Sequence, residues 1–263
     1  MQNEIFERPA EKSAVINDCC VGDGLLVPSS FRRIDGALKD EIEETDGEER
    51  IALILKKCFG IDAKVDALKA CDDLPVIELE EDLCVLELER VGKAKCATTQ
   101  KSILVAAAIA SAYVDLELDG KCRVFLPFEE KRKELTLGAV YAKAILPLEV
   151  FVGVAEEDLD KCQSWLESLS VPSASDVICV AANNECVYET MNNFNDYDDY
   201  VFDVVSALGA SAFECVEEEG DAPSVIVSVA SPFENPIATL DAFGVKAKDE
   251  KEAIKKLKTL FAL

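Results

Sequence analysis

The sequence contains no histidine among its 263 residues, and this absence excludes several classes of catalytic site. Ser-His-Asp and Cys-His arrangements both need an imidazole as the general base. Zinc sites that combine His with Cys or a carboxylate need it as a ligand. Histidine is also the side chain that most often transfers protons near neutral pH. We therefore expect a protein that is not an enzyme, with no catalytic residues, no cofactor and no metal ion.

Basic residues are also scarce, with 27 Lys and Arg against 52 Asp and Glu, which gives a formal net charge of −25. A nucleic-acid backbone needs clustered Lys and Arg, and so does an anionic membrane surface. We expect neither as a partner. Two interpretations of the acidity remain: it keeps the protein soluble, or it attracts basic surfaces of other proteins.

Signatures for phosphate binding and for membrane insertion are missing as well. Neither GxGxxG nor GxxxxGK[ST] occurs, and the GDG at Gly22–Gly24 is too short to be a phosphate loop. The longest apolar run, Ile103–Val114, is shorter than a membrane span. Polar residues at the N-terminus, such as Glu4 and Glu7, argue against a signal peptide. The predicted location is the cytoplasm or the nucleus.

Cysteine, in contrast, is frequent, with 11 residues and no CxxC pair. Many of them, such as Cys84, Cys179 and Cys215, lie within apolar runs. The odd number and these settings predict buried free thiols in a reducing compartment. Cys19 and Cys20 are adjacent, and their thiolates would be reactive if exposed, although no basic neighbour in the sequence lowers their pKa.

The segment Glu149–Ala182 shows the fold class most clearly. Val150–Val154 and Val177–Ala181 are short apolar runs, typical of strands buried on both faces. Between them, residues 156–169 show helical spacing of apolar side chains after three acidic residues. Val225–Val229 predicts a third neighbouring strand of the same sheet.

The other segments repeat this alternation of strands and helices. Further strands are predicted within 74–91, 122–128 and 212–216, and helices within 31–59, 135–146, 200–208 and 249–261; the segment 100–113 fits either. We expect an α/β fold with a mostly parallel sheet flanked by helices in three layers. An irregular N-terminal arm, 1–30, would precede a single domain, 31–263, with a sub-boundary near 147 as the alternative.

A polar, acidic insert is predicted at 183–199. Its carboxylates could bind a hard cation, but the spacing is not that of an EF-hand, and a solvated loop is favoured. Its aromatic residues Phe194 and Tyr197, with Tyr200 just after it, are the predicted partner-binding residues, because aromatic side chains are enriched at interfaces. The alternative is that they anchor the insert to the core.

The C-terminal half resembles the first subunit of the eukaryotic proteasome-assembly chaperone pair. The resemblance rests on FVGVAEEDLDKCQSWLESL followed by DVICVAA, on GASAFECVEEEGDAPSVIVSVA, and on the final helix KEAIKKLKTLF, and it covers about 148–263. The chain ends Phe261-Ala262-Leu263, with Ala262 at the position where some members of that family carry a docking tyrosine.

This resemblance implies a non-enzymatic chaperone that binds proteasome α-subunits during ring formation, together with a related partner subunit. The alternatives are an acidic protein-interaction or viral structural protein, a nucleic-acid mimic, or an enzyme that uses carboxylates and a metal ion.

Overall fold

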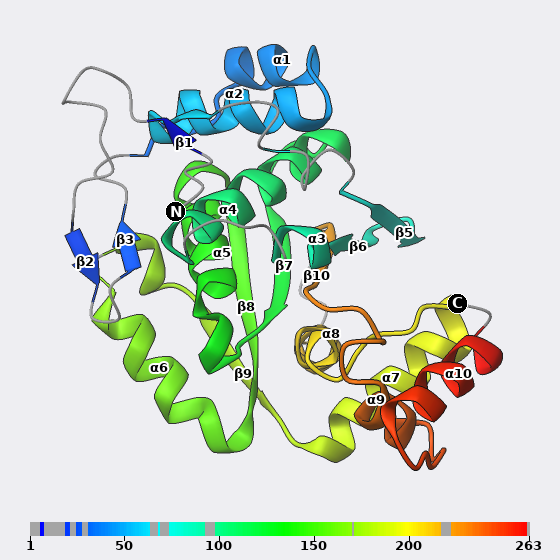
Figure 1. Ribbon diagram of the computed structural model, residues 1–263. Helices are drawn as coiled ribbons and strands as arrows, with labels where there is room; N and C mark the ends of the chain where they lie inside the picture. The colour runs from blue at the N-terminus through cyan, green and yellow to red at the C-terminus, as the bar shows by residue number, and fades with distance from the viewer. Residues whose placement is uncertain are drawn as a thin grey trace.

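The computed structural model describes residues 6–7, 19–21, 25–27, 31–63, 68, 74–92, 98–169, 171–216 and 222–261. Its centre is a six-stranded sheet in the order β5-β6-β10-β7-β8-β9, with helices on both faces (Figure 1). This mixed, mostly parallel three-layer arrangement confirms the expected α/β class. In the part of the chain that is described, no helix is long and apolar enough to cross a membrane.

Five strands of the sheet are parallel, and β5 runs antiparallel to β6 at one edge. Their bounds are β5 Val76–Glu80, β6 Leu83–Glu87, β7 Cys122–Pro127, β8 Leu148–Ala155, β9 Ile178–Ala182 and β10 Ser224–Ser228. Two short antiparallel pairs lie outside it: β1 Phe6–Glu7 with β4 Asp62–Ala63, and β2 Cys19–Val21 with β3 Leu25–Val27.

Helices α4, α5 and α6 cover one face of the sheet, and α7 and α8 cover the other (Figure 1). The α-helices are α1 Gly36–Glu43, α2 Gly47–Phe59, α3 Glu89–Gly92, α4 Thr98–Asp115, α5 Lys133–Ile145, α6 Leu159–Ser168, α7 Asn184–Asp198, α8 Ser206–Cys215, α9 Pro236–Ala242 and α10 Glu250–Leu260. Short 3-10 turns are η3 Glu130–Arg132, η4 Glu156–Asp158 and η5 Pro172–Ala174. The ambiguous segment 100–113 is helical and belongs to α4.

Alternate residues of each strand enter different cores, as the period of two requires. In β7, Val124 and Leu126 belong to the core under α4 and α5, whereas Phe125 points to the side of α7 and α8. Phe125 stacks on Phe151 of β8, with ring centroids 4.7 Å apart. Both faces of the central strands are therefore buried, which explains their continuous apolar runs.

The three strands predicted at 150–154, 177–181 and 225–229 do share one sheet, but their arrangement differs from the expectation. β7 lies between β10 and β8, so β10 is not their direct neighbour. β9 is an edge strand, and Ile178 is half exposed. An apolar run alone does not reveal this, because an edge strand of a parallel sheet can remain apolar.

Three predictions on the C-terminal side are wrong in their secondary structure. The expected loop 183–199 is helix α7, whose apolar residues Val187, Met191 and Phe194 recur at helical spacing and are buried. Asn183 caps its N-terminus by accepting a hydrogen bond from the Cys186 amide. The expected helix at 200–208 and strand at 212–216 are replaced by the single helix α8, because small residues there favour a helix that packs closely on the sheet.

Helix α8 lies with its backbone directly against the sheet. A Cβ added to Gly153 of β8 would overlap the Leu208 carbonyl of α8. In the other direction, a Cβ on Gly209 of α8 would come within 3.0 Å of the Leu126 backbone in β7. Two glycines that meet in this way remove the side-chain layer that normally separates a helix from a sheet.

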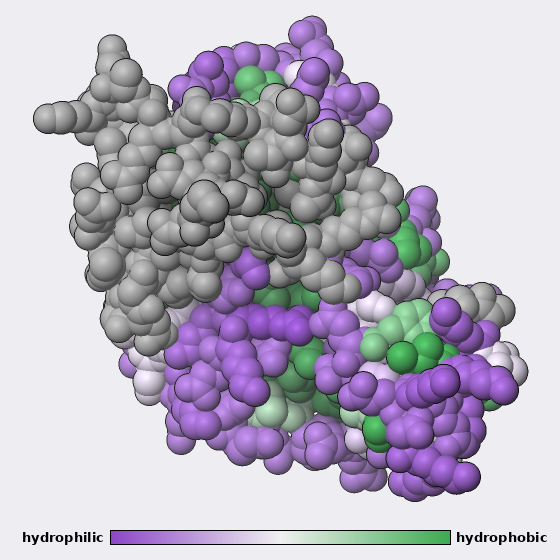
Figure 2. Space-filling view, in the orientation of Figure 1, coloured by the Kyte–Doolittle hydropathy of each residue, from purple (hydrophilic) through white to green (hydrophobic). Residues whose placement is uncertain are grey.

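Charge is distributed unevenly along the chain. No Lys or Arg occurs between Lys161 and Lys246, a stretch that contains β9, α7, α8, β10 and α9. Six lysines then follow between Lys246 and Lys258, in and around α10. Figure 2 shows hydrophilic atoms over α6 and over α9 and α10, with apolar residues visible in the recess between them.

We predict that Gly153→Ala destabilises the protein by about 3 kcal/mol or more, because α8 must move away from β8 to make room for the methyl group. Gly36→Ala is the matched control, since nothing lies within 4 Å of its added Cβ. It should be neutral, or stabilising by up to about 1 kcal/mol through helix propensity. Urea unfolding monitored by far-UV circular dichroism measures both, and equal stability of the two variants would contradict the close contact.

Candidate functional site

Polar side chains gather where the parallel strands end, which is the edge at which open α/β sheets bind ligands. Asp203 is fully buried there, ahead of α8, and accepts hydrogen bonds from the Val205 and Ser206 amides and from the Ser206 hydroxyl. The Ser206 Oγ in turn accepts from the Val229 amide at 2.9 Å. These bonds fasten the start of α8 to the end of β10.

A second set of contacts closes the same edge. Arg132, just after β7, donates to Glu234 at 2.9 Å and lies 3.2 Å from a Glu129 oxygen. The Tyr200 hydroxyl donates to Glu87 at the end of β6, also at 2.9 Å. The described polar groups at the carboxyl edge are thus largely engaged with one another, and their arrangement stabilises the loops there.

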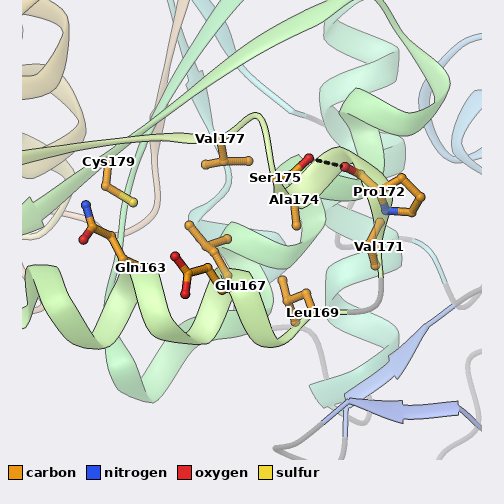
Figure 3. Close-up of a pocket in the computed structure, with 10 residues that line it drawn as sticks. Gln163, Glu167, Leu169, Val171, Pro172, Ala174, Ser175, Val177 and Cys179 are labelled. Carbon is orange, nitrogen blue, oxygen red and sulfur yellow. Dashed lines mark hydrogen bonds between the residues drawn. The ribbon is translucent and has the colours of Figure 1, made fainter.

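An open cleft lies elsewhere, between α6 and the start of β9, with a volume of about 810 Å3 (Figure 3). Volumes of 300–1,000 Å3 are typical of small-molecule sites. The described residues that line it are Gln163, Leu166, Glu167, Leu169, Val171, Pro172, Ala174, Ser175, Val177 and Cys179. The lining combines an apolar floor with a carboxylate, an amide, a hydroxyl and a thiol.

Local sequence explains how these side chains reach the cleft. On α6, Cys162 and Leu166 point to the core, while Gln163 and Glu167, one residue further on, are exposed at the rim. On the opposite side, Val177 and Cys179 are two residues apart in an extended segment and therefore face the same way. Pro172 starts the 3-10 turn η5 that bends the chain back toward β9, and the Ser175 hydroxyl donates to the Pro172 carbonyl (Figure 3).

The most reactive chemical group of the cleft is a pair of thiols. The Sγ atoms of Cys162 and Cys179 lie 3.7 Å apart, one on α6 and the other on β9. Cys162 is completely buried, whereas Cys179 is partly buried and lines the cleft. Close by, the Lys133 ammonium lies 5.6 Å from the centre of the Trp165 ring.

The two thiols have different acidities. The hydrogen bond with Cys162 lowers the pKa of Cys179, against the opposing effect of its burial. The same bond, together with burial, raises the pKa of Cys162, and the positive charge of Lys133 only partly offsets this. These opposite shifts make Cys179 the more acidic thiol of the pair. A thiolate is the nucleophilic form of cysteine.

The three aromatic residues that were predicted to bind a partner differ in their exposure. Phe194 is buried on α7 and packs edge-on against Phe202. Tyr200 is half-buried and lies against the same ring, whereas Tyr197 is 85% exposed. A partner-binding role for them stays a prediction.

Other sequence-based expectations can be placed as well. All seven cysteines whose side chains the structure describes are free, in agreement with the expected thiols. The side chains of Cys19 and Cys20 lie outside the described residues. Within the described ranges, no group of three or more His, Cys, Asp or Glu side chains could hold a metal ion.

The Cys162–Cys179 pair was not predicted from the sequence. Residues 156–169 were expected to form a helix and 177–181 the following strand, but seventeen positions separate the two cysteines. The signal was present in the strand–helix–strand pattern, because a helix that precedes a parallel strand packs beside it. Two cysteines on facing positions of such neighbours can meet.

The chain was compared with known protein families, curated sequences and solved structures. No protein-family model matches the chain, and no curated protein matches it in sequence. Solved structures do match. PLP-bound threonine synthase from Brucella melitensis aligns over 93% of this chain and 90% of its own, with a TM-score of 0.68 and 11% identity. This chain shares its fold with threonine synthases.

Two further threonine synthases support this likeness. The yeast structure covers 94% of this chain and 91% of its own length at a TM-score of 0.67 and 12% identity. The Escherichia coli structure covers 88% of this chain and 87% of its own length, with a TM-score of 0.61 and 14% identity. At such identities the likeness shows the fold.

These neighbours overturn the expected relation to the proteasome-assembly chaperones, and with it the prediction of a non-enzymatic assembly chaperone. The three solved structures described above are threonine synthases, which are enzymes. The resemblance failed for a physical reason. Apolar strands alternating with amphipathic helices are common to all parallel α/β sheets, so a matching pattern over these segments does not distinguish one family from another.

A pH dependence follows from the buried carboxyl at the sheet edge. Burial raises the pKa of Asp203 from 3.8 to about 6, although its hydrogen bonds oppose the shift. The folded state then binds this proton more tightly than the unfolded state, so its contribution to stability is present below pH 4 and is lost as pH rises through 6. The loss is on the order of 3 kcal/mol.

Urea unfolding at pH values from 4 to 7 measures this effect. Asp203→Asn cannot ionise, so the free energy of unfolding of this variant should fall less between pH 4 and 6 than that of the wild type. Its stability at any single pH also changes, because an amide nitrogen cannot accept from the Ser206 donors. The difference in slope is therefore the readout, and parallel curves would contradict the raised pKa.

Proposed function

We propose that this chain binds a small organic molecule in the α6–β9 cleft and that Cys179 reacts with it as a nucleophile. The observation that carries the proposal is the Cys179 thiol, which opens into a cleft of about 810 Å3, lies 3.7 Å from the buried Cys162 sulfur and has a lowered pKa. A cysteine whose thiolate is stabilised by its surroundings can act as a nucleophile without a histidine. The threonine synthase fold supports an enzymatic role.

The lining of the cleft indicates the class of substrate. Leu166, Leu169 and Val177 offer an apolar surface, and Glu167 stands exposed at the rim. A fitting molecule has an apolar body, an electrophilic carbon that reaches the Cys179 Sγ, and a cationic or hydrogen-bond-donating group for Glu167. The Cys179 thiolate would attack that carbon and form a C–S bond, while the bond from the carbon to its leaving group breaks and the leaving group departs with the electron pair into the open cleft. Cys162, in sulfur contact with Cys179, would keep the nucleophile oriented.

PLP, which is bound in the Brucella structure, does not fit the described residues. PLP enzymes hold the cofactor through a Schiff base with a lysine. None of the lysine side chains that the structure describes is buried, and none lines the cleft. The Lys143 ammonium is engaged by the Asp176 carbonyl at 2.8 Å, and Lys133 lies over Trp165. We therefore assign no PLP-dependent step to this chain.

The cleft proposal is tested by the kinetics of thiol alkylation. We expect N-benzyl-2-chloroacetamide to alkylate Cys179 with a rate that saturates as its concentration rises, because the apolar benzyl group binds before the thiolate reacts. Chloroacetamide, which lacks the benzyl group, should show a linear dependence. Mass spectrometry of Glu-C peptides locates the modified residue.

Two neighbouring substitutions provide a matched control for this test. Val177→Trp fills the cleft and should abolish saturation, with at least a tenfold loss of labelling at low reagent concentration. Ile178→Trp, on the opposite side of the same strand and half exposed, should leave the kinetics unchanged. Linear kinetics with both reagents in the wild type would refute the binding site.

A separate measurement tests the conclusion that the chain has no PLP site among its described residues. The chain is incubated with PLP, reduced with borohydride and digested, and modified lysines are quantified. We expect sub-stoichiometric labelling spread over several exposed lysines. Stoichiometric modification of a single lysine, with no comparable labelling of the other lysines, would show that a PLP site exists. That result would replace the thiol-based proposal.

A further inference from the structure

The thiol pair has a geometry that nucleophilic attack by Cys179 alone does not require. Its two Sγ atoms are 3.7 Å apart, and a disulfide needs about 2.05 Å. The remaining approach is less than 2 Å and lies between side chains of adjacent elements, α6 and β9. Both thiols already face each other in sulfur contact, so rotation about the side-chain bonds can bring them together.

Access to the two sulfur atoms is unequal. Cys179 lines the open cleft, whereas Cys162 has no exposed surface. A small oxidant that enters the cleft therefore meets Cys179 first. Cys162 lies behind it, in the position of a thiol that attacks the oxidised sulfur from the protein interior. This order is typical of a peroxide-sensing pair with a resolving cysteine.

We propose that Cys162 and Cys179 form a redox modification site, at which a peroxide converts the two thiols into a disulfide that joins α6 to β9. The Cys179 thiolate attacks one peroxide oxygen, the O–O bond breaks, and hydroxide leaves and takes up a proton as water. Cys162, giving up its proton, then attacks the sulfenic sulfur, and a second water leaves. Overall, two thiols and one hydrogen peroxide give one disulfide and two waters.

The disulfide would act on the cleft in two ways. It removes the Cys179 nucleophile, and it fixes the distance between the walls that carry Gln163 and Val177. Loss of ligand binding on oxidation rests on the proposed function, whereas formation of the bond does not. The two proposals can thus fail separately.

The experiment uses the full chain, reduced, treated with stoichiometric hydrogen peroxide, and then blocked with N-ethylmaleimide. Trypsin cannot separate the two cysteines, because no Lys or Arg lies between Lys161 and Lys246. Glu-C can, since it cuts after Glu157, Glu167 and Glu185. We expect the peptides 158–167 and 168–185 to be linked before reduction and separate after it, in most of the molecules.

Single variants test the order of events. In Cys162→Ser, the crosslink should be lost and dimedone should trap a sulfenic acid on Cys179. In Cys179→Ser, Cys162 should remain an unmodified thiol at the same peroxide exposure. The exposed Cys215, whose pKa is raised by burial and by nearby negative charge, serves as an internal control in every sample and should react more slowly than Cys179.

Two results would overturn the proposal: Cys179 oxidised to sulfinic acid in the wild type without a crosslink, or Cys215 oxidised before Cys179. Saturable alkylation of the reduced protein, measured in parallel, reports on the ligand site. A crosslink without saturation would leave the redox site standing and remove the proposed function. Saturation without a crosslink would leave the proposed function standing and remove the redox site. Circular dichroism confirms that each variant is folded, and Cys162→Ala replaces Cys162→Ser where it is not.

Discussion

The contact between the backbones of α8 and β8 is the constraint on which one whole face of the sheet depends. Gly153 and Gly209 permit it, and the small residues Ala207 and Ala210 keep the helix close along its length. Because α8 lies so near the strands, α7 can pack outside it and bury Phe194. The Asp203–Ser206 hydrogen bonds then only need to fasten the start of a helix whose position is already determined.

The other face is organised differently, and it is there that the cleft forms. Helix α6 is short and amphipathic, and it ends beside the edge strand β9 rather than over the middle of the sheet. An edge strand has one neighbour only, so the space beside it is not filled by another strand. The fold is shared with threonine synthases, but the described carboxyl edge is closed by its own ion pairs and hydrogen bonds. The thiol pair lies at the side of the sheet.

Much of the architecture could be predicted from the sequence, because strands buried on both faces of a parallel sheet have continuous apolar sequences. The runs at 150–154 and 225–229 are strands, and Gly60 ends α2 in the left-handed conformation expected of a C-terminal cap. The errors arose where local pattern and tertiary contact disagree. Polar residues hid the buried stripe of α7. The helix expected within 200–208 instead continues through Gly209, which packs closely on the sheet.

The site was less predictable than the fold. Cys179 was expected to be a buried free thiol, since its neighbours in the sequence are apolar, but the strand order places it on an edge strand. Sheet order is set by crossovers between distant segments, and no local pattern encodes it. The chaperone resemblance also relied on a local pattern. It rested on apolar strands that alternate with amphipathic helices, and every parallel α/β fold shows this alternation.

The stretch without Lys or Arg makes the stability of this part of the fold depend on salt concentration. Fifteen Asp and Glu residues lie between Lys161 and Lys246, so carboxylates on α7, α9 and their loops repel one another with few cations to neutralise them. Such repulsion extends over about one Debye length, roughly 10 Å at 0.1 M salt. Moderate ionic strength therefore favours the compact state of this half, in addition to the cations that already contact it, Arg132 at Glu234 and Lys246 at Asp241.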